Sequence, residues 1–230
     1  GIPYQGSGVQ ASAIGLDKIR TKALLREAGL PLAAERVITG ADTDWGALAD
    51  ELGLPLVLKT PASGSSVGVE IVADRAALAS RGTALMAEAG RLLVEQFVRG
   101  RELTLPVVET PDGRPEAFPT VFIAPRAAAF FDYEAKYTPG ATDEICPAPI
   151  DAALEERLRG LGVAAHRALG CRGYSRTDCI VADDGRVVLL EVNTLPGLTR
   201  ESLLPKAAAV HGLSFAALVE RLIQRALARS

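Results

Sequence analysis

Four polar side chains lie in two apolar stretches of the C-terminal half, where their types and spacing could do chemistry: Arg176, Asp178, Glu191 and Asn193. The stretches, 174–182 and 186–193, are rich in β-branched residues and read as strands. An Asp-Gly pair between two apolar runs is a strong hairpin signal. Because side chains alternate along a strand, the hairpin puts all four polar groups on one face, with Arg176 opposite Asn193.

The expected hairpin register brings two carboxylates together. A two-residue turn at 184–185 pairs Asp183 with Arg186. In the same register Asp178 lies opposite Glu191, and facing carboxylates repel. A hard cation between the two carboxylates turns this repulsion into a net attraction. Mg²⁺ is such a cation, because it takes oxygen ligands and leaves positions for phosphate and water. The pattern favours a magnesium site, and a solvated polar face of an amphipathic hairpin stays open as the alternative.

A loop of small residues, "KTPASGSSVG" at 59–68, follows the expected strand 54–60. Small residues let backbone N–H groups approach phosphate oxygens, and Lys59 adds a positive charge. The loop lacks the GxxxxGK[ST] pattern and precedes a strand, which argues against a P-loop or Rossmann protein. A flexible turn is the alternative. Lys18 and Lys22 lie four apart on one expected helix, and Glu95 and Glu102 bracket an expected seam between two lobes.

Composition limits the function classes. The chain has 230 residues, 48% hydrophobic content and a net charge of −3, so nothing in it demands a nucleic-acid or membrane partner. Its apolar runs are too short to cross a bilayer. The cysteines, Cys146, Cys171 and Cys179, are odd in number and lack CxxC spacing. They are expected to be free thiols in a cytosolic protein.

The remaining pattern predicts an α+β architecture, because strands and helices alternate irregularly. Apolar spacing predicts helices over 12–28, 44–52, 74–89, 151–168 and 214–228, the last capped by Ser214. Further strands are expected over 69–72, 91–98, 102–109 and 117–123. Residues 126–149 have little periodicity and are expected to form either a functional loop or a disordered one. The seam between lobes is expected near 95–102.

Several segments resemble, in this order, the D-alanine–D-alanine ligase family of ATP-grasp enzymes: "GIPYQGSG", "LDKIRTK", "LVLKTPASGSSVGV", "LLVEQFVRGRELT", "FFDYEAKYTPGATDEICPAP", "GCRGYSRTDCIV" and "LLEVNTLPGLTRESLLPKAA". The resemblance covers essentially the whole chain. It implies two α+β lobes whose antiparallel sheets clamp ATP. The smaller lobe, 1–98, would carry the phosphate loop and adenine edge. The larger lobe, 99–230, would carry the covering loop and metal site.

The resemblance also implies site residues. ATP would be bound by lysines, loop serines, acids and one backbone group, namely Lys18, Lys59, Lys136, Ser65, Ser66, Glu95, Val98 and Glu102. Two Mg²⁺ ions, with Mn²⁺ as a possible substitute, would be held by Asp178, Glu191 and Asn193. Catalysis and substrate binding would fall to Arg176, Tyr137, Ser65, Gly197, Ser202 and Leu203.

Within these sets the implied roles differ. Glu95 and the Val98 backbone would meet adenine, and Glu102 the ribose. Lys136 and Tyr137 belong to the loop that covers the site. Gly197 would supply an oxyanion donor, and Ser202 with the Leu203 amide would hold the carboxylate of the second amino acid.

The implied activity is ATP-dependent ligation of two D-alanines through an acyl phosphate, giving ADP and phosphate. It would serve peptidoglycan synthesis, cell-wall biogenesis and cell shape in the cytoplasm. The full-length protein would be a homodimer without nucleic-acid or membrane partners. A ligase that joins other amino acids and a nucleotide-binding module without ligase activity are the alternatives. The sequence departs from the family pattern in two ways. The family carries an additional N-terminal domain before the segment "GIPY", and its phosphate loop commonly has charged residues where this sequence has Ala62-Ser63.

Overall fold

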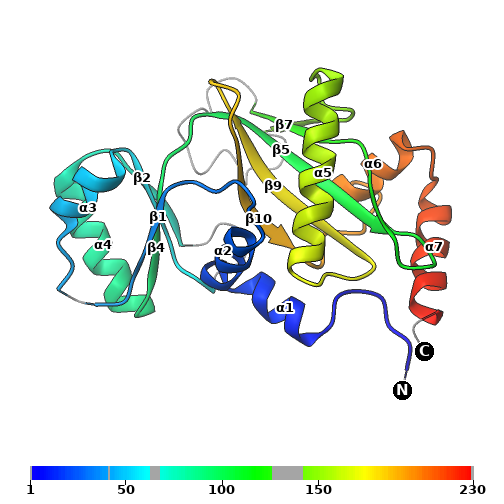
Figure 1. Cartoon of the computed structure of the whole chain (residues 1–230), viewed down its shortest axis with the longest axis horizontal. Helices are drawn as coiled ribbons and strands as arrows, with labels where there is room; N and C mark the ends of the chain where they lie inside the picture. Colours follow the sequence, from blue (N-terminus) through cyan, green and yellow to red (C-terminus); the bar gives the residue numbers. More distant parts are fainter. Residues whose placement is uncertain (1, 41, 63–67, 126–141, 229–230) are drawn as a thin grey trace.

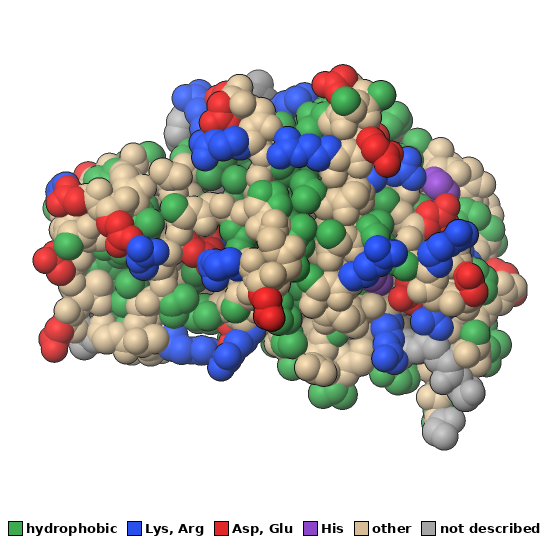
Figure 2. All heavy atoms as spheres, in the orientation of Figure 1, with side chains coloured by type: hydrophobic (Ala, Val, Ile, Leu, Met, Phe, Trp, Pro, Cys, Tyr) green, Lys and Arg blue, Asp and Glu red, His purple; other side chains and the backbone are tan. Residues whose placement is uncertain are grey.

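The fold is built on two antiparallel sheets that follow one another along the chain (Figure 1). The protein is represented by a computed structural model that describes residues 2–40, 42–62, 68–125 and 142–228. The predicted α+β architecture is confirmed. In the space-filling view, basic and acidic side chains are interspersed over the visible face, as the small net charge of −3 suggests (Figure 2).

The first sheet has four strands in the order β1 (Glu35–Ile38), β4 (Leu92–Gln96), β2 (Leu56–Lys59) and β3 (Val69–Val72). Two helices cover one of its faces, α3 (Trp45–Leu52) and α4 (Arg75–Ala89). Each helix begins where an aspartate side chain accepts a backbone N–H, Asp44 for α3 and Asp74 for α4. The core between sheet and helices includes Trp45, Leu58 and Leu78. Among the described residues, α3 and α4 cover one face of this sheet, and Lys22 of α2 reaches Glu95 on the other.

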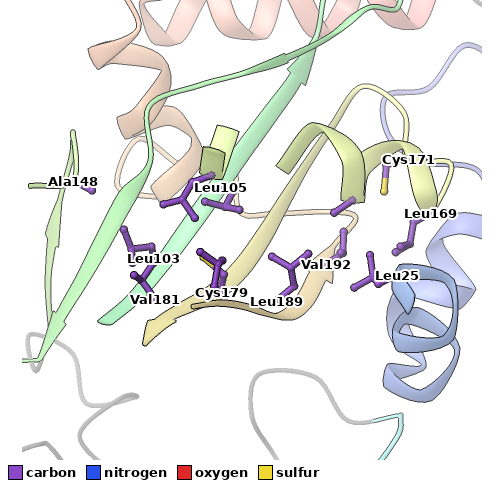
Figure 3. Packing of buried hydrophobic residues seen from close by; sticks show 13 residues of the cluster. Leu25, Leu103, Leu105, Ala148, Leu169, Cys171, Cys179, Val181, Leu189 and Val192 are labelled. Atoms are coloured by element: carbon purple, nitrogen blue, oxygen red, sulfur yellow. The ribbon is translucent and has the colours of Figure 1, made fainter. Parts of the chain in front are cut away.

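The second sheet has six strands: β10 (Val187–Asn193), β9 (Tyr174–Ala182), β5 (Gly100–Glu109), β7 (Val121–Pro125) and β8 (Thr142–Ile145) in that order, with β6 (Pro115–Ala117) also paired to β5. One face packs on α5 (Ala152–Ala168) and α2 (Lys18–Glu27). In that core Leu25 of α2 lies beside Val192 and Leu189 of β10 (Figure 3). Cys146, Cys171 and Cys179 are free, as predicted.

Among the described residues, helices cover the opposite face of the second sheet only in part. Helices α6 (Leu203–Val210) and α7 (Phe215–Leu227) pack their buried leucines on one end of it, around Tyr174, Val108 and Val121. The Ser214 cap of α7 is confirmed, because its hydroxyl accepts the Ala217 N–H at 3.2 Å. The other end of this face carries Arg176, Asp178 and Glu191, which stay only half-buried. The sheet thus leaves a polar area open beside α6.

The single helix predicted over 12–28 is wrong. The chain forms α1 (Val9–Leu16) and α2, separated at Asp17. The Asp17 side chain accepts the N–H groups of Ile19 and Arg20 at 3.0 and 3.2 Å, so it caps a new helix instead of continuing the old one. Four short elements were also missed: β1, α6, β8, which lies in the segment predicted as loop, and β6, of which only Ala117 falls in a predicted strand.

The hairpin turn differs from its prediction. Ala182 N–H donates to the Arg186 carbonyl at 2.8 Å, so the turn has three residues, 183–185, and ends on Gly185 at φ +82°. The predicted pair of Asp183 with Arg186 is therefore wrong. A β-bulge between Leu189 and Glu191 then shifts the register by one residue.

The bulge compensates for the shorter turn. Beyond it Asp178 lies opposite Glu191, and Arg176 opposite Asn193, so both predicted pairs are confirmed. Asp178 and Glu191 therefore face each other because the three-residue turn and the β-bulge shift the register in opposite directions.

The division into lobes at residue 98 stays a prediction. Each sheet has cores of its own. Helices α1 and α2, which the prediction placed in the smaller lobe, contact β10 of the larger sheet. Gly15 of α1 approaches so closely that a Cβ there would lie 2.7 Å from Thr194 Cγ2.

No single helix in the described part of the chain is long and apolar enough to cross a membrane. Helices α6 and α7 together meet that length and composition, with a bend of 105° between them.

A buried carboxylate away from the open faces ties the second sheet to its helices. Glu109 at the end of β5 accepts the Gly173 N–H at 2.8 Å and Arg225 Nε of α7 at 2.6 Å. His166 Nε2 of α5 lies 3.5 Å from its other oxygen. Burial disfavours the charged form, but these groups hold the pKa of Glu109 at about 2.

We expect Glu109→Gln to destabilise the fold at pH 7 by roughly 2 to 3 kcal/mol. Because the pKa of Glu109 is depressed on folding, its contribution is present above the unfolded value and is lost as pH falls from about 5 towards 2. The stabilities of variant and wild type should therefore converge at low pH. Urea unfolding at several pH values measures this, with the exposed Glu88→Gln as the control. A difference that does not depend on pH would contradict the assignment.

Candidate nucleotide and metal site

The open face of the first sheet is apolar with a charged centre. The strand register aligns four residues across this face, one from each strand: Glu35, Glu95, Val57 and Ile71. The next aligned set on the same face is Val37, Leu93, Lys59 and Val69. Val37 and Ile71 are exposed although they are large and apolar. Leu93 and Glu95 at the centre of this face are buried, so exposed apolar residues lie beside buried charges, as is typical of a small-molecule site.

The charges at this centre form an alternating chain. Glu95 is 2% exposed and pairs with Lys22 of α2 through one oxygen and with Lys59 of β2 through the other. Lys22 also lies 3.7 Å from Glu35, which pairs with Arg26. Burial alone would raise the pKa of Glu95, but Lys59 and Lys22 lower it to about 2. Glu95 is therefore an ionised carboxylate with two cationic partners.

The lysines of α2 face both sheets. Lys22 is 1% exposed and donates to the Leu189 carbonyl of β10 at 3.1 Å. Burial lowers the pKa of Lys22, against the raising effect of Glu95. Burial likewise lowers the pKa of Lys18, which lies one helical turn earlier, while nearby Glu191 raises it. Helix α2 thus carries two desolvated lysines where β4 and β10 approach each other.

On the second sheet, Asp178 is held in a fixed orientation. Arg176 donates to both of its oxygens, from Nε and Nη2, each at 3.0 Å. The Thr104 hydroxyl of the neighbouring strand donates to Oδ1 at 2.5 Å. Burial alone would lower the pKa of Arg176, but Asp178, Glu191 and Glu102 raise it. The guanidinium stays charged and faces several carboxylates.

The donor set of the hairpin fits a hard cation. Asp178 and Glu191 are directly opposite, and Asn193 follows on the same edge. Among the described residues no three acidic, histidine or cysteine side chains gather as a metal-binding group, so an amide oxygen would have to be the third ligand. The Asn193 oxygen accepts the Leu195 N–H at 3.0 Å, which fixes its direction. All-oxygen sets of this kind suit Mg²⁺ better than Zn²⁺.

The segment after β10 brings Gly197 against Ser202. A Cβ at Gly197 would lie 2.7 Å from Ser202 Oγ. That hydroxyl also accepts the Thr199 N–H at 3.2 Å, and Ser202 occupies the N-cap position of α6 without capping it by its side chain. Leu203 opens α6, so its N–H is among those without a partner inside the helix. Backbone and hydroxyl donors thus converge beside the hairpin.

For the amino-acid ligation that the sequence resemblance implies, we expect Gly197→Ala to raise the KM for the second amino acid about 10-fold or more and to leave the KM for ATP nearly unchanged. The added methyl group must displace Ser202, which lies on the α6 side of the site. Steady-state phosphate release with each substrate varied in turn measures this. Gly160→Ala on α5, where a Cβ meets nothing, is the matched control. Equal changes in both KM values would contradict a local effect.

The structure places most of the predicted site residues around the two open faces. Lys18, Lys59 and Glu95 lie together, as do Arg176, Asp178, Glu191 and Asn193. Glu102 is paired with Ile180 on the open face of the second sheet. Val98 is half-buried and lies in the segment that links β4 of the first sheet to β5 of the second. Ser65, Ser66, Lys136 and Tyr137 lie outside the described residues, and their roles stay predictions.

Three contributors had no predicted role: Lys22, Glu35 and Thr104. The spacing of Lys22 from Lys18 was a signal, because residues four apart share a helix face. Thr104 lies two residues after Glu102, on the same strand face. Nothing in the sequence indicated the strand that carries Glu35.

Two antiparallel sheets that are joined through the buried Lys22 of α2 have the architecture of an ATP-grasp fold, and solved structures of D-alanine ligases match it. The structure titled D-alanine–D-alanine ligase from Bacillus anthracis complexed with ATP matches with a TM-score of 0.81 and 32% identity, covering 98% of this chain and 70% of that one. The VanG D-Ala:D-Ser ligase from Enterococcus faecalis matches with a TM-score of 0.84 and 31% identity, over 98% and 65%.

The sequence comparisons agree. The family model described as D-ala D-ala ligase C-terminus matches residues 11–224. A curated D-alanine–D-alanine ligase from Desulfotalea psychrophila is 46% identical, over 100% of this chain and 72% of the relative. The chain belongs to the D-alanine–D-alanine ligase family. It is the ATP-grasp portion of an ATP- and Mg²⁺-dependent ligase.

Proposed function

We propose that this chain, with the rest of its protein, joins two D-alanines through an acyl phosphate for peptidoglycan precursor synthesis. The observation that carries the proposal is the hairpin that aligns Asp178, Glu191 and Asn193 and holds Arg176 beside them. Family membership supports the substrate, because curated relatives over the whole chain are named for D-alanine ligation.

ATP lies against the open face of the first sheet in this proposal. Adenine packs on its apolar residues, with Glu95 and the Val98 backbone at its polar edge, and Glu102 meets the ribose. Lys18 and Lys59 reach the phosphates, as does Lys136, while Ser65 and Ser66 close over them. The low exposure of Lys18 and Lys59 supports this, since desolvated ammonium groups attract phosphate more strongly than solvated ones.

Asp178, Glu191 and Asn193 would hold two Mg²⁺ ions, or Mn²⁺ in their place. Bound there, the ions supply neutralising charge to the phosphate oxygens. The contribution of the chain itself is to position the proposed metal ligands. Thr104 and Arg176 fix Asp178, and the β-bulge brings Glu191 opposite it. The first D-alanine carboxylate then attacks the γ-phosphate, and ADP leaves.

The second step uses donors on the α6 side. Ser202 and the Leu203 amide bind the carboxylate of the second D-alanine, whose amine attacks the acyl phosphate carbonyl. Arg176 and the Gly197 amide stabilise the developing oxyanion, and phosphate departs. Such a donor is typically worth about 10²–10³-fold in rate. Tyr137 and Ser65 cover the reacting groups and exclude water, which would otherwise hydrolyse the acyl phosphate.

The two-lobe division, 1–98 and 99–230, and the cellular setting are further parts of this proposal. We infer that the full-length protein is a cytoplasmic homodimer without nucleic-acid or membrane partners. The cytoplasmic location is supported by the three free cysteines, since thiols persist in a reducing compartment.

The test is phosphate release by the full-length protein with Mg-ATP and a panel of acceptors. We expect release that depends on D-alanine and yields D-alanyl-D-alanine, with D-lactate inactive as the second substrate. D-serine is the informative comparison, because a D-Ala:D-Ser ligase is among the structural matches. Preference for D-serine or another amino acid would support a related ligase. Mg-ATP binding without release, or release independent of any amino acid, would overturn the ligase assignment.

A further inference from the structure

Lys22 is the most deeply buried of the described charged groups at the open face of the first sheet, and the proposed mechanism gives it no role. It is 1% exposed on α2. Its ammonium group has three acceptors around it: one Glu95 oxygen, the Leu189 carbonyl at 3.1 Å and a Glu35 oxygen at 3.7 Å. These come from β4, β10 and β1. A group with that many partners from three strands is fixed in place.

Lys59 differs from Lys22 although both contact Glu95. Its side chain is 12% exposed and comes from the end of β2, where the phosphate loop begins. Lys22 and Lys59 take different oxygens of the same carboxylate. If Lys59 turns to a phosphate, one oxygen of Glu95 loses its partner while the other keeps Lys22. A buried carboxylate with no cation left would be strongly disfavoured.

We propose that Lys22 is a positioning residue for the nucleotide: it is the fixed partner of Glu95, which lets Lys59 exchange from Glu95 to an ATP phosphate. The inference rests on the proposed ATP site and deepens it. Lys22 contacts no substrate in this assignment. It acts through Glu95 and, by its bond to Leu189, also anchors the strand segment just before the β10 bulge. The neighbouring charges are Glu35, Arg26 and Lys18.

The consequence is specific to ligands with phosphate. Among the described residues Glu95 pairs with Lys22 and Lys59, so without Lys22 the move of Lys59 to phosphate leaves the buried carboxylate without a paired cation. Adenosine, which has no phosphate, does not require Lys59 to move. The measured quantity is therefore the ratio of the dissociation constant of adenosine to that of Mg-ATP. Any contact between Glu95 and adenine affects both ligands and cancels from the ratio.

We expect Lys22→Met to lower this ratio by about 100-fold in titration calorimetry of the full-length protein. The double variant Lys22→Met with Glu95→Gln should bring the ratio back to within about 3-fold of wild type, because no buried carboxylate then competes for Lys59. Glu95→Gln alone should keep or raise the ratio. Arg26→Met, at the exposed end of the same charge chain, is the matched control and should leave the ratio unchanged.

The outcomes separate this inference from the proposed function. Wild-type protein that does not prefer Mg-ATP to adenosine would refute the ATP site itself. A wild type with that preference and a Lys22→Met variant that loses both ligands equally would show Lys22 to be only structural. If Lys22→Met does not fold, the ratios measured for Glu95→Gln and for the double variant still test the proposal. A ratio that falls in Glu95→Gln, or stays low in the double variant, would overturn the proposal.

Discussion

Replacing Glu191 with glutamine is expected to lower Mg²⁺-dependent ATP turnover by about 100-fold or more while the fold is kept. Even residues that only orient metal ligands typically cost 10–100-fold when changed, and Glu191 is a proposed direct ligand. The substitution keeps the shape of the side chain. It also removes the repulsion between Glu191 and Asp178, which lie directly opposite in the hairpin. The substitution also removes the attraction of Glu191 for Lys18 and Arg176, which offsets that gain, so the metal-free variant should be about as stable as wild type.

Two measurements check this expectation. Phosphate release across a Mg²⁺ titration gives the turnover, and thermal unfolding with and without Mg-ATP gives the stabilisation by ligand. Wild type should gain stability with Mg-ATP, and the variant should gain much less. Asp183→Asn in the turn of the same hairpin is the control, because that exposed residue lies outside the open face. Normal turnover by Glu191→Gln would falsify the metal assignment.

Arg176→Lys is expected to lower kcat about 10²–10³-fold with little change in the KM for ATP. The guanidinium donates from Nε and Nη2 to both oxygens of Asp178. A lysine has a single point of contact and cannot hold that carboxylate while also facing the reacting carbonyl. Because the proposed role lies in the transition state, the loss should fall on kcat and on kcat/KM alike.

Arg186→Lys provides the matched control, since Arg186 makes a similar pair with Asp184 at the exposed turn of the same hairpin. It should leave turnover within about 2-fold of wild type, because exposed pairs contribute little. The assay should follow dipeptide and phosphate separately. A variant that loses ATP binding with an unchanged kcat would place Arg176 at the nucleotide and not at the acyl transfer.

The helices and strands show which elements can be predicted from the local sequence alone. Helices over 44–52, 74–89 and 151–168 were predictable because an aspartate cap and apolar spacing agree at each. The error at Asp17 has the same origin, since a capping residue within a continuous apolar pattern ends one helix and begins another. Strands β1 and β8 were missed because their four residues include few apolar ones, ERVI and TDEI, whereas the equally short β2 and β3 are mostly apolar and were predicted.

The hairpin shows a prediction that was right for an incomplete reason. Alternation correctly put Asp178, Glu191, Arg176 and Asn193 on one face. The turn length was wrong, and the bulge after Leu189 was not visible in the sequence. The register near the site came out correctly only because these two features offset each other. Turn type and bulges depend on how the whole strand pair packs, so local residues do not fix them.

By itself, the sequence determined the family, the α+β class and the identity of the polar groups at the hairpin, because residue types and their periodicity are local properties. Only the tertiary structure decided that Glu95 is shared between Lys22 and Lys59 and that Lys22 also reaches the Leu189 carbonyl of β10. These contacts join residues from both sheets. The physical reason is burial: a lysine on a helix face is ordinarily solvated, and it becomes a fixed partner only when two sheets close over it and remove its water.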